Sequence, residues 1–433
     1  MTLACDTRTP VTILRAVAHG PLGIVRSLGR LGVPVYVVDP DPRTPAATSR
    51  YCRGHFRCDV DALPAERVVA ALRAAADVIG RRSILVPTTD AATVLVDSHA
   101  DRLREVFLLP AAPPGLAAAL SSKEEMYHLA LRHGIPTPHT VFPRSRGDVL
   151  DFLATRPPFP VMLKGIDGVR LQQRGGARMF LVRDATELVA RYDAVEDPAD
   201  PNIMLQEYIP GGEDSVWMFN GYFDARSECL LGFTGKKLRQ YPAYTGATSL
   251  GICLANPAVD AVTRSFMKAI GYRGILDIGY RYDHRDGAYK VLDVNPRIGA
   301  TFRLFVAGNE MDVARALYLD LTGQPVPAGT APDGRKWIVE DKDLISSVRY
   351  RLDRQLTVRR WLGSLRGIDE AAYLASDDAR PVFALCARAA RELARRLLGA
   401  RRWRDRNGVS PRRARGVPLA IGARGVQRTT TGA

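Results

Sequence analysis

The chain has 433 residues, of which 46% are hydrophobic and 25% are charged. This composition excludes disorder for most of the chain, and the length predicts two or three domains. No apolar run reaches the ~20 residues needed to cross a bilayer, and Asp6 and Arg8 make the N-terminus unlike a secretion signal. Six scattered cysteines without a CxxC pair favour a reducing cytosol over a disulfide framework or a zinc site.

The formal net charge of +15 is concentrated near the C-terminus. Residues 380–433 hold fourteen arginines and two acids, a net +12, so the other 379 residues carry only +3. An apolar stripe opposite several arginines predicts an amphipathic helix in this basic tail, formed by Val382, Phe383, Leu385, Ala389, Leu393 and Leu397. We expect disorder beyond Asn407. The charge therefore belongs to an appendage, not to the main body of the chain.

The N-terminal part alternates between strand and helix patterns. Apolar runs at 11–14, 33–38 and 84–87 predict buried strands, with helical segments between them, the second at 65–76. This alternation predicts a parallel sheet with helices on both faces. Gly20 and Gly23 supply only GxxG, and Asp39 at a strand end is typical of a turn, so the signal for dinucleotide binding is weak.

The pattern changes from about residue 115. A helix with a capping box begins at 121–125, and strands are predicted at 160–164 and 179–182, separated by a Gly- and Arg-rich loop over 165–178. The apolar run 203–209 stops at Pro210. Asn256 and Pro257 begin a helix, two strands follow at 274–283 and 289–294, and 324–335 reads as a linker.

Cationic side chains stand at two of these element ends. Lys123 lies at a helix start and Lys164 at a strand end, where each could meet phosphate. The glycines of the 165–178 loop would let backbone N–H groups close over phosphate oxygens. Gln206 to Ile209 could offer backbone groups to an adenine edge, and Glu213 could accept ribose hydroxyls. A lone lysine or a glycine cluster is usually an ordinary surface feature, so the order of these elements carries the argument.

Acidic and amide side chains alternate on the last predicted strand. Asp293 and Asn295 point to one face, and two hard oxygen ligands there suit Mg²⁺ together with substrate phosphates. Arg297 could neutralise charge on a transferred phosphoryl group.

The order of these motifs resembles the ATP-grasp superfamily over roughly residues 10–322. The matching pieces are Ser-Ser-Lys123-Glu, Phe-Pro-Val-Met-Leu-Lys164, Gln206-Glu-Tyr-Ile-Pro-Gly-Gly-Glu213 and Leu-Asp293-Val-Asn295-Pro-Arg297. The stretch from Gly235 to Gly246 is similar to the carboxylate–amine ligase branch, which includes D-aspartate ligase-like enzymes.

The resemblance implies a mixed α/β and α+β protein in three parts. Residues 1–115 would form a parallel-sheet pre-ATP-grasp domain, 116–323 a two-lobed ATP-grasp domain, and 324–433 a linker, the basic helix and a disordered tail. Such enzymes sandwich ATP between two lobes, phosphorylate a carboxylate and let an amine attack the acyl phosphate. Chemistry of this kind requires positioning and charge stabilisation but no side-chain nucleophile.

The resemblance also assigns the candidate site. ATP would be bound by Lys123, Lys164, Gln206, Glu207, Ile209 and Glu213. Mg²⁺ would be held by Asp293 and Asn295, and Arg297 would stabilise the phosphoryl group. Lys237 and Arg239 are candidates for binding substrate anions, with ordinary surface charge as the alternative.

One position departs from the family pattern. The strand before the Asp-x-Asn motif usually carries another acidic metal ligand, and here Gly279 occupies that position. Asp277 lies two residues earlier on the same strand face and is predicted to replace it. If it does not, the alternative is a non-catalytic ATP-binding module.

The expected function is therefore an ATP- and Mg²⁺-dependent ligase that joins a small carboxylate to an amine. We expect it in the cytoplasm, with a homodimer as a further hypothesis. The basic tail is expected to attach to an anionic membrane, at the inner membrane face, or else to pack on its own domain. Nucleic acid is the less expected partner, because only Phe383 and Trp403 offer aromatic stacking.

Overall fold

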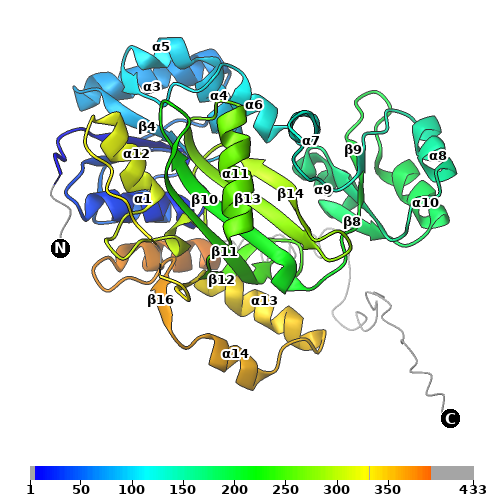
Figure 1. The fold of residues 1–433 in the computed structure, drawn as a ribbon. Coiled ribbons are helices and arrows are strands. Elements are labelled where there is room, and N and C mark those ends of the chain that lie inside the picture. Colours follow the sequence, from blue (N-terminus) through cyan, green and yellow to red (C-terminus); the bar gives the residue numbers. More distant parts are fainter. Residues whose placement is uncertain (1–4, 331, 392–433) are drawn as a thin grey trace, which may run out of the picture. The chain divides into compact units, whose positions relative to one another are not determined.

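The computed structural model describes residues 5–330 and 332–391, apart from the side chain of Glu213. The chain separates into two compact units after Ala384, and the three sheets all belong to the first unit (Figure 1). The basic-tail helix is described only as far as residue 391, so Leu393, Leu397 and the stretch beyond Asn407 lie outside the described residues.

The N-terminal sheet is parallel throughout, as predicted, with the order β3-β2-β1-β4-β5. Its strands are β1 (Val11–Leu14), β2 (Val35–Val38), β3 (Cys52–Phe56), β4 (Ser83–Pro87) and β5 (Phe107–Leu108). Its helices are α1 (His19–Gly29), α2 (Pro45–Thr48), α3 (Ala65–Ile79), α4 (Asp90–Ser98) and α5 (Ala100–Arg104). The near-continuous apolar runs of β1, β2 and β4 are buried, which is typical of parallel strands covered on both faces.

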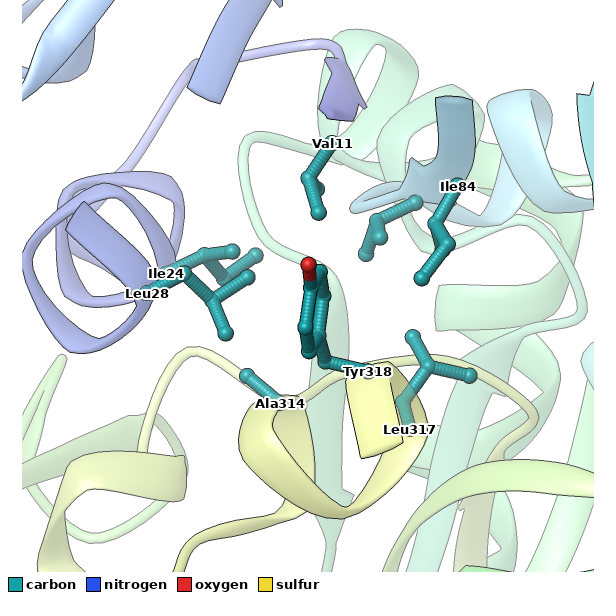
Figure 2. A pocket seen from close by; sticks show the side chains of 8 residues that line it. Val11, Ile24, Leu28, Ile84, Ala314, Leu317 and Tyr318 are labelled. Carbon is teal, nitrogen blue, oxygen red and sulfur yellow. The ribbon is translucent and has the colours of Figure 1, made fainter. Parts of the chain in front are cut away.

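The N-terminal sheet is joined to the rest of the unit by α12 (Val313–Leu321), far along the chain. Figure 2 shows the Tyr318 ring of α12 among apolar side chains from β1, β4 and α1. The Tyr318 hydroxyl donates to the carbonyl oxygens of Asp6 and Thr9, each at 3.1 Å. This tightly filled contact buries apolar surface between two segments about 300 residues apart in sequence, and so fixes the N-terminal domain against the remainder.

A four-stranded antiparallel sheet forms one lobe, with the order β6-β9-β7-β8 (Figure 1). Its strands are β6 (Thr140–Val141), β7 (Val161–Gly165), β8 (Met179–Val182) and β9 (Ile203–Glu207). The helices α8 (Arg146–Ala154) and α10 (Ala185–Val195) contribute Phe152, Leu188 and Tyr192 to a core with Leu163 and Leu205. Side chains of both helices thereby cover the strands that carry Lys164 and Gln206.

The segment 165–178 is not the open loop that the sequence suggested. It contains α9 (Gly168–Gly175), which begins where the Asp167 carboxylate accepts the N–H groups of Val169 and Arg170, at 2.8 and 3.2 Å. Gly176 ends the helix in the left-handed conformation, at φ +78°. A side-chain cap and a glycine stop suffice for two turns of helix, and the expectation of a loop was therefore wrong.

The seven-stranded sheet forms the other lobe, with the order β14-β13-β10-β11-β12-β15-β16. Its strands are β10 (Val216–Phe223), β11 (Cys229–Tyr241), β12 (Ala247–Cys253), β13 (Gly274–Asp283), β14 (Ala288–Asn295), β15 (Lys336–Ile338) and β16 (Ile368–Ala371). The sheet packs against α11 (Pro257–Ala269), which has the predicted Asn256 cap: its carboxamide oxygen accepts the Val259 N–H at 3.1 Å. The helices α6 (Leu116–Ser121) and α7 (Lys123–Arg132) connect the lobes to the N-terminal domain.

Two strands of this sheet come from beyond residue 323. In the expected linker, 324–335, the described residues form no helix or strand, but β15 and β16 then join the sheet. Between them lie α13 (Glu340–Leu352) and α14 (Val358–Ser364). The predicted domain boundary at 323 stays a prediction, although the sheet of the second lobe continues past it.

The described part of the chain contains no helix long and apolar enough to cross a membrane. The six cysteines are free, which agrees with the expectation that the chain has no disulfide framework.

Candidate functional site

Two lysines from different elements lie close together at the junction of the lobes. Lys123 is the first residue of α7, whose Ser122 cap accepts the Glu125 N–H at 3.3 Å. The Lys123 ammonium donates to the Gly165 carbonyl oxygen at 2.7 Å, which places it at the end of β7 beside Lys164. The structure thus brings these two predicted phosphate ligands together.

Both ammonium groups are destabilised by their surroundings. Burial lowers the pKa of Lys123, and burial together with the nearby Lys123 charge lowers the pKa of Lys164 to about 8. The Asp293 carboxylate acts in the opposite direction on both lysines. Two like charges held in a partly dry site would be relieved by an anion between them, so the electrostatics favour phosphate binding.

The strand β9 holds Lys164 in position through Gln206. The Lys164 ammonium donates to the Gln206 carboxamide oxygen at 2.5 Å, and the Gln206 amide donates to the Thr140 hydroxyl at 3.0 Å. Gln206 is buried, with 6% of its surface exposed. Gln206 therefore fixes the position of the Lys164 ammonium through this hydrogen bond. Any contact of Gln206 with a nucleotide stays a prediction.

The residues after Gln206 are tied down by arginines of β13 and its turn. The Glu207 carboxylate pairs with Arg285 at 2.5 Å, and the Ile209 carbonyl oxygen accepts from Arg281 at 2.9 Å. Glu213 begins a short 3₁₀ turn at Glu213–Ser215, and its side chain is not described. These contacts link the two lobes along the segment expected to bind adenine and ribose. Nucleotide binding by Glu207, Ile209 and Glu213 stays a prediction.

Asp277, Asp293 and Asn295 converge on neighbouring strands. In the β13–β14 register, Asp277 stands opposite Asn295, and Gly279 stands opposite Asp293. The Asn295 amide lies 3.1 Å from an Asp293 oxygen and 3.5 Å from an Asp277 oxygen. Burial raises the pKa of Asp277 to about 6, with a further contribution from the Asp293 charge. The Asp293 charge thus disfavours ionisation of Asp277, and a cation between the two carboxylates would relieve this, which fits a divalent cation such as Mg²⁺.

Two residues that the sequence analysis did not single out shape the Asp277 carboxylate. Asn220 of β10 is fully buried opposite Asp277, and its side-chain hydrogen bond lowers the Asp277 pKa. On the other side lies Gly299, where an added Cβ would stand 2.4 Å from the Asp277 carboxyl carbon. The glycine of the motif Asn-Pro-Arg-Ile-Gly could have indicated this close approach, because glycine often marks a position where another group comes close to the backbone.

Arg297 is held between the end of β14 and the N-terminal domain. Its guanidinium donates to the Asn295 oxygen at 3.0 Å and to the Asp90 carboxylate at 2.5 Å. Asp90 is the first residue of α4, directly after β4. Sequence reasoning missed Asp90, although ligands of open α/β sheets bind beyond the carboxyl ends of the strands, where Thr88, Thr89 and Asp90 lie.

The two candidate substrate-binding cations diverge in the structure. Lys237 faces the site: its ammonium donates to the Gly246 carbonyl oxygen at 3.2 Å, and its charge lowers the Asp277 pKa. Arg239 is buried instead and forms a bidentate pair with Asp343 of α13, at 2.7 and 2.9 Å. A bulge between the two residues shifts the register of β11 against β12. A substrate role for Arg239 stays a prediction, and its contacts favour a structural one.

No protein-family model matches the chain. Among curated proteins, the D-aspartate ligase of Enterococcus faecium (strain Aus0004) is 25% identical over 243 residues, which are 54% of this chain and 58% of that relative. The match thus spans less than two thirds of the relative's length.

Solved structures match over more of the chain. The ADP complex of N5-carboxyaminoimidazole ribonucleotide synthetase has a TM-score of 0.61 at 12% identity, over 82% of this chain and 87% of that one. The L-amino acid ligase of Bacillus licheniformis has a TM-score of 0.57 at 16% identity, over 77% and 79%. Together with the ordered motifs and their convergence, these likenesses confirm the predicted fold: the chain has the ATP-grasp fold.

Proposed function

We propose that the protein is an ATP-dependent carboxylate–amine ligase. The observation that carries this proposal is the convergence of Lys123, Lys164, Asp293, Asn295 and Arg297 between the two lobes. Cationic groups for phosphates and oxygen donors for a cation are the parts that phosphoryl transfer requires. The similarity to D-aspartate ligase and L-amino acid ligase supports the reaction class.

The reaction would proceed in two steps. A carboxylate oxygen of the first substrate attacks the terminal phosphorus of ATP, and ADP leaves, giving an acyl phosphate. The amine then attacks the acyl carbon, inorganic phosphate leaves with the bonding electron pair, and the nitrogen loses a proton. Lys123 and Lys164 would hold the phosphates, and Arg297 would stabilise the charge on the transferred group.

Asp277, Asp293 and Asn295 would hold Mg²⁺, which neutralises phosphate charge when it is bound. Two carboxylates and one carboxamide oxygen are hard donors of the kind that this ion prefers. Among the described residues, no group of three or more His, Cys, Asp or Glu side chains offers a site for a metal, and Asn295 must supply the third donor here.

The experiment that tests the proposal is ADP release by the purified full-length protein. Pooled carboxylates, with D-aspartate and the L-amino acids as the first members, are combined with pooled amines, ATP and Mg²⁺. Release that needs both pools supports ligation, and mass spectrometry of the product should show an amide. ATP binding without release over the whole panel would favour a non-catalytic module instead, the alternative that Gly279 motivates.

The remaining expectations are extensions of this proposal. A cytoplasmic location and a homodimer stay predictions. Binding of the basic tail to an anionic membrane also stays a prediction. Leu393 and Leu397 of its stripe lie outside the described residues; within them, residues 380–391 are helical and Phe383 is 71% exposed.

A further inference from the structure

The helix α13 is amphipathic in the reverse of the usual sense. Its buried side chains are mainly polar: Asp343, Ser346, Ser347 and Tyr350. Its exposed side chains include four large aliphatic ones: Leu344 at 55%, Ile345 at 52%, Val348 at 54% and Leu352 at 72%. At 3.6 residues per turn these four form one stripe, and a surface helix normally turns such a stripe toward the core.

Polar contacts fix this orientation. Asp343 forms the buried ion pair with Arg239, and the Ser346 hydroxyl lies 3.2 Å from the Ser249 hydroxyl of β12. The Tyr350 hydroxyl accepts the Tyr244 N–H at 3.1 Å. Rotating α13 to bury its leucines would break these bonds and leave a buried charge unpaired, which is costly. These polar contacts therefore hold α13 with its apolar stripe facing outward.

The surroundings of the stripe are strongly basic. From Leu344 to Arg366 the chain carries six arginines and one acid, Asp353. On the α13 wheel, Arg349 and Arg351 flank the stripe on its two sides. The next helix, α14, has no buried residue, and exposes Val358 and Leu362 together with Arg359 and Arg360. Figure 1 shows both helices at the outer edge of the unit, beyond the seven-stranded sheet.

We propose that α13 and α14, residues 340–364, form a docking surface for an anionic lipid bilayer. The aliphatic side chains would enter the boundary between headgroups and acyl chains, and the flanking arginines would contact lipid phosphates. This surface is distinct from the basic tail, and its role does not depend on the ligase reaction.

Charge and side-chain type favour a bilayer over other occupants. A second copy would place the same residues 340–364, with a net charge of +2 and with the exposed Arg359 and Arg360, against themselves, which opposes association. Nucleic acid is bound through arginines and stacking aromatic rings, whereas the stripe is aliphatic. An aliphatic face bordered by arginines is typical of helices that lie in the membrane interface.

The first test is co-sedimentation of the full-length protein with phosphatidylcholine vesicles, with or without phosphatidylglycerol. We expect binding to the anionic vesicles, weakened about tenfold or more in the double variant Val348→Asp, Leu352→Asp. The control is Val78→Asp, because Val78 of α3 is 75% exposed and lies on the N-terminal domain. This control should bind as the unmodified protein does.

The second test separates charge from apolar contact. The variant Arg359→Glu, Arg360→Glu should lose about tenfold or more in affinity for anionic vesicles, because each arginine near such a surface contributes about 1 kcal/mol. Its control is Arg67→Glu, Arg81→Glu, since both of those arginines are also exposed. Melting curves should show that all variants are folded.

Three results would overturn the proposal. The unmodified protein could fail to sediment with anionic vesicles at low salt. Both α13–α14 variants could bind as well as their controls, which would assign binding to another basic segment. A dimer lost in the Val348→Asp, Leu352→Asp variant, without any change in vesicle binding, would make the stripe an interface between copies of the chain.

Discussion

Lys164 lies partly buried at the meeting point of the lobes and donates to the neutral carboxamide of Gln206. If it serves phosphate, Lys164→Ala should weaken ATP binding by about 2–3 kcal/mol, the range for hydrogen bonds to charged groups, while the protein stays folded. Calorimetric titration with ATP measures this. The control Lys268→Ala removes an exposed lysine paired with Glu228 and should leave the affinity unchanged. An unchanged affinity in the Lys164 variant would remove Lys164 from the site.

The lowered pKa of Lys164 also predicts a pH dependence. Because this pKa is about 8, roughly half of the free protein carries an uncharged Lys164 at pH 8. Bound phosphate favours the ammonium, so ATP binding should take up roughly half a proton at that pH. Affinity should then fall as the pH rises above 8, by up to about tenfold per unit. Titrations in two buffers of different ionisation enthalpy measure the uptake, which Lys164→Ala should abolish.

The Asp277 and Gly279 pair makes a third prediction at the residue scale. If Asp277 supplies the carboxylate missing at 279, Asp277→Asn should reduce Mg²⁺-dependent ADP release about 10- to 100-fold or abolish it, since an amide attracts Mg²⁺ less. Gly279→Asp should be tolerated or should tighten Mg²⁺ binding. A Cβ at 279 would meet nothing within 4 Å, and the position stands opposite Asp293. An active Asp277→Asn protein with the Mg²⁺ dependence of the wild type would contradict the replacement.

Among the elements, the segment after β16 fastens the C-terminal part of the unit to the N-terminal domain. The buried Asp378 carboxylate pairs with Arg26 of α1 at 3.0 Å and accepts the Ser49 hydroxyl at 2.7 Å and the Arg50 N–H at 3.0 Å. The same guanidinium donates to the carbonyl oxygens of Ala372 and Tyr373. A single carboxylate thus completes the contact between segments more than 300 residues apart.

Removal of that carboxylate should be costly. We expect Asp378→Ala to lower the free energy of unfolding by about 3–5 kcal/mol, because it leaves the Arg26 charge buried without its counter-ion. Urea denaturation measures the change. The neighbouring Asp377 pairs with Arg30 at 2.9 Å but is 37% exposed, so Asp377→Ala should cost about 1 kcal/mol or less. Equal effects of the two variants would show that burial does not distinguish the pairs.

At the scale of the whole unit, the site depends on the N-terminal domain. The Asp90 carboxylate from α4 holds Arg297, which also contacts Asn295 at the end of β14. Asp90→Ala should therefore lower kcat about tenfold, equivalent to about 1.4 kcal/mol, because Arg297 loses its fixed position while Lys123 and Lys164, the proposed phosphate ligands, are untouched. The kinetic measurement should show ATP affinity unchanged. A fall in ATP affinity with kcat preserved would show that Asp90 acts on nucleotide binding instead.

Local patterns determined much of this protein. The parallel strands of the N-terminal sheet follow from apolar runs that alternate with helical segments. The start of α11 follows from Asn256 and Pro257, and the shared face of Asp293 and Asn295 follows from the two-residue repeat of a strand. Each of these features depends on residues a few positions apart, so the sequence alone contains the necessary information.

Only the tertiary structure decided which distant groups meet. Arg239 and Lys237 have the same charge and lie two residues apart, yet one pairs with Asp343 and the other faces Asp277. Asp90 reaches Arg297 across 207 positions, and β15 and β16 join the seven-stranded sheet from positions 336–371, far along the chain from its other strands. The periodicity of a segment specifies which face it buries but not its partner. Pairings between segments far apart are fixed by packing and by the need to satisfy buried charges.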